Sequence, residues 1–447
     1  MGPRARMAVR IMNIIVHRGT KEIGGSCIEV RSAMTRLILD LGMPLVAPWN
    51  KKEKLESGAY LKMTAKELLE AGVLPRVSGL YAVNASDPVT AVLLSHPHQD
   101  HYGLLAHIHA DIPVYLSDGT RRIIAASDIF LPLKVRIKHP QPFEDRKMVT
   151  IGDLRVTPYL MDHSGYGAMS FLIEGEGKKV FYTGDFRAHG RKWKLFPRFL
   201  RTAPKGVDCL LMEGTTLGRP GKTAETEDDI EKRIVEIAKR RRGLKLIYAS
   251  GQNIDRLVSF YRAAIRTRSL MVVDLYTAYV LDSLGAASIP SPSPRWPALR
   301  VLYTKYLMTK IARSGMSRLF KQYRDSEIAP AQIAKDPGRV FLMYRESLTS
   351  EIESIGDFRE AVLIYSMYEG YRQEPSFVKV QAFLDRNGIA IESAHTSGHA
   401  CFDDLKRMAE ALKPQRLIPI HTFQPERYAE LWPAVHTLND GEEFAVC

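Results

Sequence analysis

The stretch His96-Pro97-His98-Gln99-Asp100-His101 decides the fold of this chain, and it directly follows the apolar residues 91–95. That apolar run predicts a buried strand, so the polar stretch lies at a strand end. His96 and His98 stand two apart on extended backbone, which projects both rings to one side and toward one ion. Asp100 and His101 follow at a turn into a helix and can face a second ion. Imidazole nitrogens mixed with carboxylate oxygens suit zinc, and manganese or iron also accept them.

Three further polar residues follow predicted strands in the same way. His163 comes after the strand 154–160, Asp185 after 180–183, and His421 after 417–420. Each would count as an ordinary turn residue if it stood alone. Because the same chain also carries the 96–101 stretch, all three are expected to be metal ligands. A two-ion site needs more donors than one strand end supplies.

Length and composition bound the class of protein. A chain of 447 residues with 45% hydrophobic and 25% charged residues is typical of a globular protein with two domains. No stretch approaches the roughly 20 apolar residues that cross a bilayer, and the short apolar run 9–16 lacks a signal-peptide cleavage site. The four cysteines are far apart without CxxC spacing, which favours reduced thiols over a disulfide framework. We therefore expect a cytoplasmic protein that does not enter membranes.

The charge balance points to a polyanionic partner. The formal net charge is +13 and the pI is near 9.4, which favours RNA, DNA or an anionic lipid surface, although basic proteins without such partners are common. The basic run 240–242 alone does not decide this, because cations at a helix C-terminus also complement the helix dipole.

The pattern of predicted strands and helices changes twice along the chain. Residues 1–213 alternate β-rich runs (23–30, 35–40, 91–95, 114–116, 154–160, 170–174 and 180–183) with helical patterns. After Glu213 a helix is predicted over 223–242, followed by strands and helices in alternation, as in a parallel sheet. The β-rich texture returns near 390. We expect a first domain in two segments, 1–213 and 391–447, interrupted by an inserted domain over 214–390.

These motifs together resemble a known family. The order Asp40, HxHxDH, His163 and Asp185 is similar to the metallo-β-lactamase fold. Glu213 in Met212-Glu213-Gly214-Thr215-Thr216, His399 in His395-Thr396-Ser397-Gly398-His399, and His421 resemble the further motifs of its β-CASP nuclease branch, with ribonuclease J-like enzymes nearest. The resemblance implies an α/β fold, an αββα sandwich with a smaller inserted α/β β-CASP domain.

The resemblance also implies roles for individual residues. His96, His98 and His163 would hold the first of two Zn²⁺ ions, Asp100, His101 and His421 the second, and Asp185 would bridge them; Mn²⁺ also fits. Asp40 would orient a ligand, and Glu213 would polarise His399 as a general acid. His395, Ser397 and Gly398, in a turn before the predicted helix 402–412, would contact phosphate, with Ser366 as a further candidate.

The expected function is hydrolysis of single-stranded RNA, from the 5′ end, internally or both. Three alternatives stay open: a DNA nuclease of the same family, a hydrolase of small esters or lactones, and an inactive RNA-binding subunit. Two departures from ribonuclease J-like chains bear on this. The chain stops soon after His421, so the usual C-terminal assembly domain is expected to be absent, which leaves homo-oligomer formation by that route in doubt. The last motif also reads His421-Thr422-Phe423-Gln424 instead of His-Gly-Glu.

Overall fold

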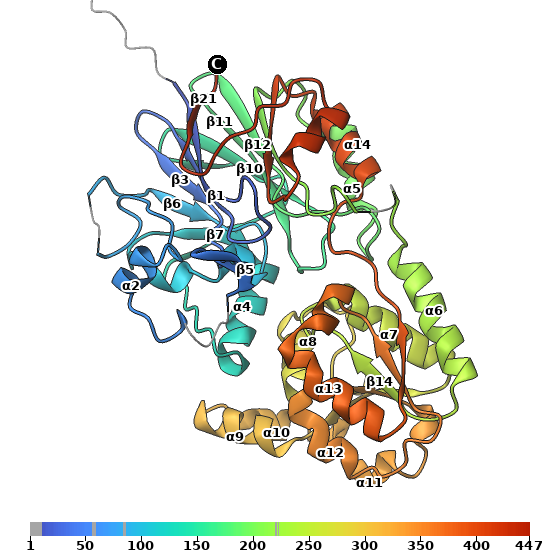
Figure 1. The fold of residues 1–447 in the computed structure, drawn as a ribbon. Helices are drawn as coiled ribbons and strands as arrows, with labels where there is room; N and C mark the ends of the chain where they lie inside the picture. The colour runs from blue at the N-terminus through green and yellow to red at the C-terminus, as the bar shows by residue number, and fades with distance from the viewer. Residues whose placement is uncertain (1–10, 56–59, 84–85, 220, 222) are drawn as a thin grey trace, which may run out of the picture.

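The computed structural model describes residues 11–447 apart from 56–59, 84, 85, 220 and 222. Figure 1 shows two units, an upper one with two sheets and a lower one that carries the helices α6 to α13, whose bounds are given below. Within the described part of the chain, no helix combines the length and the apolar character that a bilayer span requires.

The first unit is a sandwich of two mixed sheets. In spatial order the first sheet contains β21 (Glu443–Ala445), β1 (Asn13–Arg18), β2 (Cys27–Arg31), β3 (Arg36–Leu39), β6 (Ala91–Leu93), β7 (Val114–Ser117) and β8 (Pro140–Phe143). The second contains β20 (Arg416–Ile420), β13 (Cys209–Glu213), β12 (Lys178–Tyr182), β11 (Met169–Gly175), β10 (Leu154–Leu160) and β9 (Val149–Ile151). A hairpin of β4 (Val46–Ala47) and β5 (Asn50–Lys54) stands apart.

Alternation along the strands builds the layers. Leu37 and Leu39 of β3 face the second sheet, whereas Ile38 faces an outer cluster with α2 (Ala65–Glu70). Leu211 of β13 likewise joins the core between the sheets. Its neighbours Leu210 and Met212 pack beneath α5 (Leu195–Thr202) and α14 (Phe402–Leu412). This period of two is what a strand buried on both faces requires. The predicted αββα sandwich is therefore confirmed.

The lower unit is a parallel sheet covered on both faces. Its strands, in spatial order, are β16 (Leu299–Leu302), β15 (Leu270–Asp274), β17 (Val340–Met343), β14 (Lys245–Tyr248), β18 (Val362–Tyr365) and β19 (Ala390–Ser393). Its helices are α6 (Glu227–Arg240), α7 (Ile254–Arg266), α8 (Leu275–Ser283), α9 (Lys305–Arg313), α10 (Arg318–Gln322), α11 (Pro330–Ile333), α12 (Thr349–Glu353) and α13 (Pro375–Arg386). All its strand pairs are parallel, as the alternation of strands and helices predicted.

The remaining short elements connect these layers. They are α3 (Gln99–Tyr102), α4 (Asp118–Phe130) and the 3₁₀ turns η1 (Leu105–His107), η2 (Arg324–Ser326), η3 (Pro337–Arg339), η4 (Glu346–Leu348), η5 (Glu369–Gln373) and η6 (Pro425–Glu430). Helix α4 belongs to the first unit, but its residues Ile123, Ala126 and Phe130 pack into the core of the lower unit. The two units therefore share apolar contacts.

Several predicted boundaries shift. The strand expected over 23–30 begins at Cys27, because Gly24 and Gly25 have φ of +86° and +68° and turn the chain before it. The helix expected over 223–242 spans Glu227–Arg240, where Thr226 and Asp229 form a reciprocal capping box. Strand β19 pairs with β18, so the sheet of the lower unit extends to Ser393, past the expected boundary at 390.

Candidate metal centre and active site

The candidate site lies where several strands of the sandwich end. Strands β12, β13 and β20 run parallel, and β10 is antiparallel to β11, which is antiparallel to β12, so the C-terminal ends of all four lie at one edge. In the other sheet β3 and β6 also run parallel. Glu213 is the last residue of β13, and the residues that follow the other strands include His163, Asp185 and His421, and Asp40 with the 96–101 stretch. Parallel strand ends thus gather groups that are distant in sequence.

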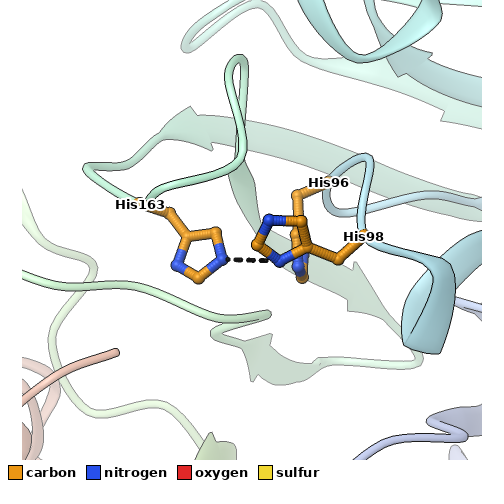
Figure 2. Close-up of side chains that lie close together, drawn as sticks. All are labelled: His96, His98 and His163. Carbon is orange, nitrogen blue, oxygen red and sulfur yellow. Dashed lines mark hydrogen bonds between the residues drawn. The ribbon is translucent and has the colours of Figure 1, made fainter. Parts of the chain in front are cut away.

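Three histidines form the first group of candidate ligands. His96 and His98 approach from the loop after β6 and His163 from the loop after β10 (Figure 2). The His96 ring centroid lies 4.7 Å from that of His98 and 4.5 Å from that of His163. His163 Nε2 is 3.2 Å from His98 Nδ1. The potential ligand atoms all lie within 4.8 Å of one another, which fits a single ion.

A second group stands beside the first and shares a carboxylate with it. Asp100, His101 and His421 bring their ligand atoms within 4.8 Å of one another, and so do His96, His101 and Asp185. Asp185 Oδ2 lies 3.1 Å from His101 Nε2, 3.7 Å from His96 Nε2 and 3.8 Å from His421 Nε2. The structure therefore brings together all seven residues predicted as ligands, with Asp185 between the two groups.

Unpaired buried atoms indicate that this cluster fits metal ions. These buried atoms lack a hydrogen-bond partner among the described residues: His96 Nε2, His101 Nε2, His421 Nε2 and both carboxylate oxygens of Asp185. Leaving such atoms unsatisfied is costly, since each lost the hydrogen bonds it made with water. Imidazole nitrogen and carboxylate oxygen are the donors that zinc accepts, so an ion would satisfy atoms that the protein leaves open.

The electrostatics of the cluster agree with a cation site. Burial, reinforced by neighbouring imidazoles, holds the pKa of His96 and His163 well below the ordinary value, so both rings are neutral and able to bind metal. Burial also opposes charge on His101, but Asp185, Asp100 and Asp40 outweigh it and raise the pKa of His101 well above the ordinary value. Without an ion, the carboxylates thus draw a proton onto His101.

Asp40 lies on the side of the candidate ligand His101 that faces away from the candidate metal site. Its Oδ2 lies 2.7 Å from His101 Nδ1 and accepts hydrogen bonds from Ser95 Oγ and Tyr182 OH, each at 2.6 Å. Its Oδ1 accepts the backbone N–H of Ser95 at 2.7 Å. A carboxylate on Nδ1 leaves Nε2 of His101 free to face the candidate metal site, the usual arrangement behind ligating histidines.

Sequence reasoning did not identify two serines and one tyrosine that hold Asp40 and the candidate ligands in place. Ser26 Oγ lies 2.9 Å from His421 Nδ1, and Ser95 Oγ lies 3.0 Å from His96 Nδ1. Tyr182 reaches Asp40 from β12. A lone serine or tyrosine in or beside a strand has no spacing pattern that would have marked it, although Ser95 directly precedes the histidine stretch.

Two of the site residues adopt left-handed backbone conformations. Asp40 has a φ of +58° and His421 a φ of +50°. Side chains with a Cβ disfavour this region, at a cost on the order of 1–3 kcal/mol each. The surrounding contacts hold both residues there: the N–H of Asp40 donates to Leu93 O at 2.9 Å, and that of His421 to Gly19 O at 2.7 Å. Such strain is concentrated at functional sites.

Glu213 and His399 form a pair next to Asp185. His399 Nδ1 lies 3.5 Å from both Glu213 Oε1 and Asp185 Oδ2. Three backbone N–H groups fix the Glu213 carboxylate, from Phe186 (3.3 Å), Thr215 (3.0 Å) and Ala400 (3.4 Å). Burial opposes the charged form of His399, but Glu213 and Asp185 prevail and raise its pKa. The ligand atoms of these three residues also lie within 4.8 Å of one another, so they form a further candidate metal group.

The predicted phosphate turn lies beside this pair. Ser397 Oγ accepts the backbone N–H of His399 at 3.1 Å. Gly398 packs so closely that a Cβ there would stand 2.4 Å from Ser164 Oγ, so only glycine fits without a shift. Burial, together with the charges of Arg256 and Arg187, lowers the pKa of His395 to about 4, and its buried Nδ1 has no hydrogen-bond partner in the described part of the chain. The turn therefore offers a neutral ring and a hydroxyl.

The expectation for Ser366 needs correction. Its side chain is buried, with 2% of the residue exposed. Its hydroxyl donates to the carbonyl of Ala394 and accepts from the guanidinium of Arg256. Both partners belong to the protein interior, so Ser366 is not available to a substrate phosphate. It supports the chain beneath the turn instead.

A buried charged cluster anchors the turn and joins the two units. Its guanidinium groups belong to Arg187, which follows β12, and Arg256 of α7; both are completely buried. Arg187 Nη1 donates to Ser397 O at 3.0 Å, and Arg256 Nη2 to Thr396 O at 3.3 Å. The carboxylates that balance them are Asp162, Glu227 and Asp255. His189, which had no motif context in the sequence, also lies here, with Nε2 2.9 Å from Ser397 O.

Comparisons with known proteins place these features in context. Residues 73–232 match the model of the beta-lactamase superfamily domain, and residues 389–426 match that of the Zn-dependent metallo-hydrolase RNA specificity domain. The second match contains the turn at 395–399 and His421. The two matches therefore cover the candidate metal ligands and the phosphate turn, but not most of the lower unit.

Whole-chain likenesses extend over nearly all of the sequence. Ribonuclease J of Helicobacter pylori is 22% identical over 90% of this chain and 55% of that protein. Ribonuclease J of Sinorhizobium meliloti is 24% identical over 79% of this chain and 62% of that protein. This chain thus spans little more than half the length of these curated relatives. A crystal structure of a protein of unknown function from Enterococcus faecalis V583 shares the fold, with a TM-score of 0.75, 20% identity and coverage of 97% of this chain and all of the other.

Proposed function

Because this chain belongs to the metallo-β-lactamase superfamily, in its β-CASP, ribonuclease J-like family, we propose that it is a two-zinc enzyme that hydrolyses single-stranded RNA. The observation that carries the proposal is the position of Asp185. It lies between the histidine group of His96, His98 and His163 and the group of Asp100, His101 and His421, so one carboxylate can serve two ions.

The metal pair would supply the Lewis-acid chemistry. When bound, two ions activate water as the nucleophile and neutralise charge on the phosphodiester. The protein's part is to fix the ligands. Asp40 orients His101, Ser26 orients His421 and Ser95 orients His96, so each ring presents its second nitrogen to the site.

His399 is the proposed general acid for the leaving oxygen. It is one-fifth exposed, so its ring reaches both the cluster and solvent, and Glu213 stabilises its protonated form. Since Glu213 is held by three backbone N–H groups, the ring has a fixed partner from which to act. The proton would pass from His399 to the oxygen that departs when the phosphodiester bond breaks.

The turn 395–398 would hold a phosphate next to the bond that is cut. Ser397 and Gly398 stand before α14, whose N-terminus adds a positive dipole end, and the buried guanidinium groups of Arg187 and Arg256 stabilise the turn from beneath. The net charge of +13 supports a polyanionic substrate. We propose that this site cleaves RNA from the 5′ end, internally or in both ways.

One experiment tests the proposal directly. Purified protein is incubated with 5′-end-labelled single-stranded RNA and with DNA of the same sequence, with added zinc or manganese and with a chelator. Labelled mononucleotides from RNA indicate a 5′ exonuclease, and internal fragments indicate an endonuclease. Cleavage of DNA in preference to RNA would reassign the substrate. If neither polymer is cut with metal present, the nuclease proposal fails.

A further inference from the structure

Two exposed tyrosines and an arginine form a cluster that the proposed chemistry does not use. Tyr368 and Tyr371, on and beside η5, place their ring centroids 5.6 Å apart in an edge-to-face arrangement. The guanidinium carbon of Arg219 stands 4.9 Å from the Tyr368 centroid. Despite these contacts, Tyr368 stays 47% and Tyr371 42% exposed. We call these three residues the aromatic platform.

The backbone beneath the platform is held firmly. Tyr365 OH donates to Tyr368 O at 3.0 Å, and the N–H of Tyr371 donates to the same carbonyl at 3.0 Å. On the other side, the N–H of Arg219 donates to Thr216 O at 3.0 Å, in the turn that directly follows Glu213. The platform is therefore assembled from the lower unit and from a turn next to the proposed catalytic pair.

The platform borders the metal centre. Gln424, three residues after His421, packs on the residue before Arg219: a Cβ at Gly218 would meet its side-chain amide at 2.1 Å. Phe423, in between, is exposed. The turn that carries Arg219 therefore packs against the loop that follows His421, a candidate metal ligand.

A nucleobase is the ligand that this chemistry suits. Unpaired bases stack on tyrosine rings and on guanidinium planes, and such stacking tolerates any sequence because every base has a π-face. Arg219 adds a positively charged guanidinium group beside the Tyr368 ring. A base paired in a duplex has no free face to offer, so a platform of this kind selects single strands.

We propose that Tyr368, Tyr371 and Arg219 form a base-stacking subsite that holds an unpaired nucleobase of the substrate next to the bond that is cut. The inference rests on the proposed function and refines it, because it assigns the single-strand preference to named side chains. Phe423, which is exposed, supplies a further aromatic side chain in the loop against which the Arg219 turn packs. Its position in the His421-Thr422-Phe423-Gln424 motif is where ribonuclease J-like chains carry the Glu of His-Gly-Glu.

The test separates stacking from phosphate binding. Dissociation constants are measured for a short single-stranded oligoribonucleotide and for an abasic chain with the same number of phosphodiesters, in a His399→Ala background that slows cleavage. Tyr368→Ala and Tyr371→Ala are expected to weaken binding of the base-bearing chain by about 5- to 100-fold, the range for one or two lost stacking contacts. Each substitution should therefore reduce the preference for the base-bearing chain, measured as the dissociation constant of the abasic chain divided by that of the base-bearing chain. Tyr371→Phe keeps the ring and should retain the ratio.

A matched control comes from α9. Tyr306 is 50% exposed and lies 5.2 Å from Lys310 Nζ, so it reproduces an exposed tyrosine beside a cation on an element that packs against the end of α4. Tyr306→Ala should leave both constants unchanged. If Tyr368→Ala and Tyr371→Ala weaken the binding of both oligonucleotides equally, or leave the binding of both unchanged, the platform does not stack bases. The inference is then overturned.

The wild-type protein distinguishes this failure from failure of the proposed function. If it cleaves RNA but the tyrosine variants keep full discrimination, only the platform is wrong. If it hydrolyses bis(p-nitrophenyl) phosphate with added metal, yet neither binds nor cleaves RNA, the RNA substrate itself is wrong, whatever the tyrosines do.

Discussion

Arg187 Nη2 donates to Asp255 Oδ2 at 2.6 Å, across the junction between the sandwich and the lower unit, with both side chains buried. Asp255 also accepts the Nζ of Lys192 at 2.8 Å and the backbone N–H of Arg191 at 3.1 Å. The same guanidinium holds Ser397 O in the phosphate turn. The contact that joins the units therefore also shapes the proposed substrate site.

Replacement of Asp255 should destabilise the protein strongly. Asp255→Ala leaves the Arg187 charge buried without its closest partner, for which the expected cost is about 3–5 kcal/mol in the free energy of unfolding. Asp228→Ala is the matched control, because Asp228 pairs with Arg191 at 2.6 Å but is exposed, where about 0–1 kcal/mol is expected. Urea unfolding measures both, and equal losses would contradict the assignment.

The buried carboxylate of Glu227 should make stability depend on pH. Burial alone would raise its pKa, but Arg256 and Arg187 outweigh burial and lower the pKa from 4.5 to about 2. A lowered folded-state pKa means stability that is present above pH 4.5 and is lost as the pH falls toward 2. The contribution is on the order of 3 kcal/mol.

Glu227→Gln should therefore lower stability at pH 7 and flatten its decline between pH 4.5 and the lowest pH at which the protein stays folded. Urea unfolding at a series of pH values provides the comparison, with Glu236→Gln, an exposed carboxylate on the same helix, as the control. If the free energy of unfolding falls as steeply with decreasing pH in Glu227→Gln as in the wild type, groups other than Glu227 cause the decline.

Asp40 should control metal affinity without binding metal itself. Asp40→Asn keeps the size of the side chain but removes its negative charge. The hydrogen bonds that the carboxylate makes with His101 Nδ1, Ser95 Oγ and Tyr182 OH are therefore weakened. Loss of such support typically costs 10–100-fold in metal affinity. Competition with a zinc chelator measures this, and Asp111→Asn, an exposed aspartate next to His109, is the control. Unchanged affinity would mean that His101 is held by other contacts.

His399→Ala should separate catalysis from metal binding. Removal of a general acid should reduce RNA cleavage by about 10²–10⁴-fold, while the metal content stays that of the wild type. Metal analysis of the purified variant is the essential second readout, because His399, Asp185 and Glu213 also form a candidate ligand group. Loss of an ion in the variant would reassign His399 as a ligand.

The seven candidate ligands could be predicted because each stands at the end of a strongly apolar strand, and strand ends of one sheet gather at one edge. The αββα layers followed from the same alternation, as Leu37, Ile38 and Leu39 show. Ser366 was misjudged for a related reason: it also ends a buried strand, β18, but its carbonyl and hydroxyl are used inside the fold.

Apart from Asp40, the residues that support the candidate ligands could not be predicted. Ser26, Ser95 and Tyr182 act through single hydrogen bonds that depend on how two sheets meet, and no spacing in the sequence records that. The burial of Arg187 could not be predicted either, because it depends on Glu227 of α6 and Asp255 of α7, which reach it only when the lower unit packs against the sandwich.

The insertion also fixes when the site can form during synthesis. Strands β13 and β20 are neighbours in one sheet, yet the whole lower unit lies between them in the sequence. A ribosome has released His96, His98 and His163 long before it reaches His399 and His421. A growing chain can therefore bring six of the seven candidate ligands together early, but it gains His399 and the last candidate ligand, His421, only after the intervening unit has been made.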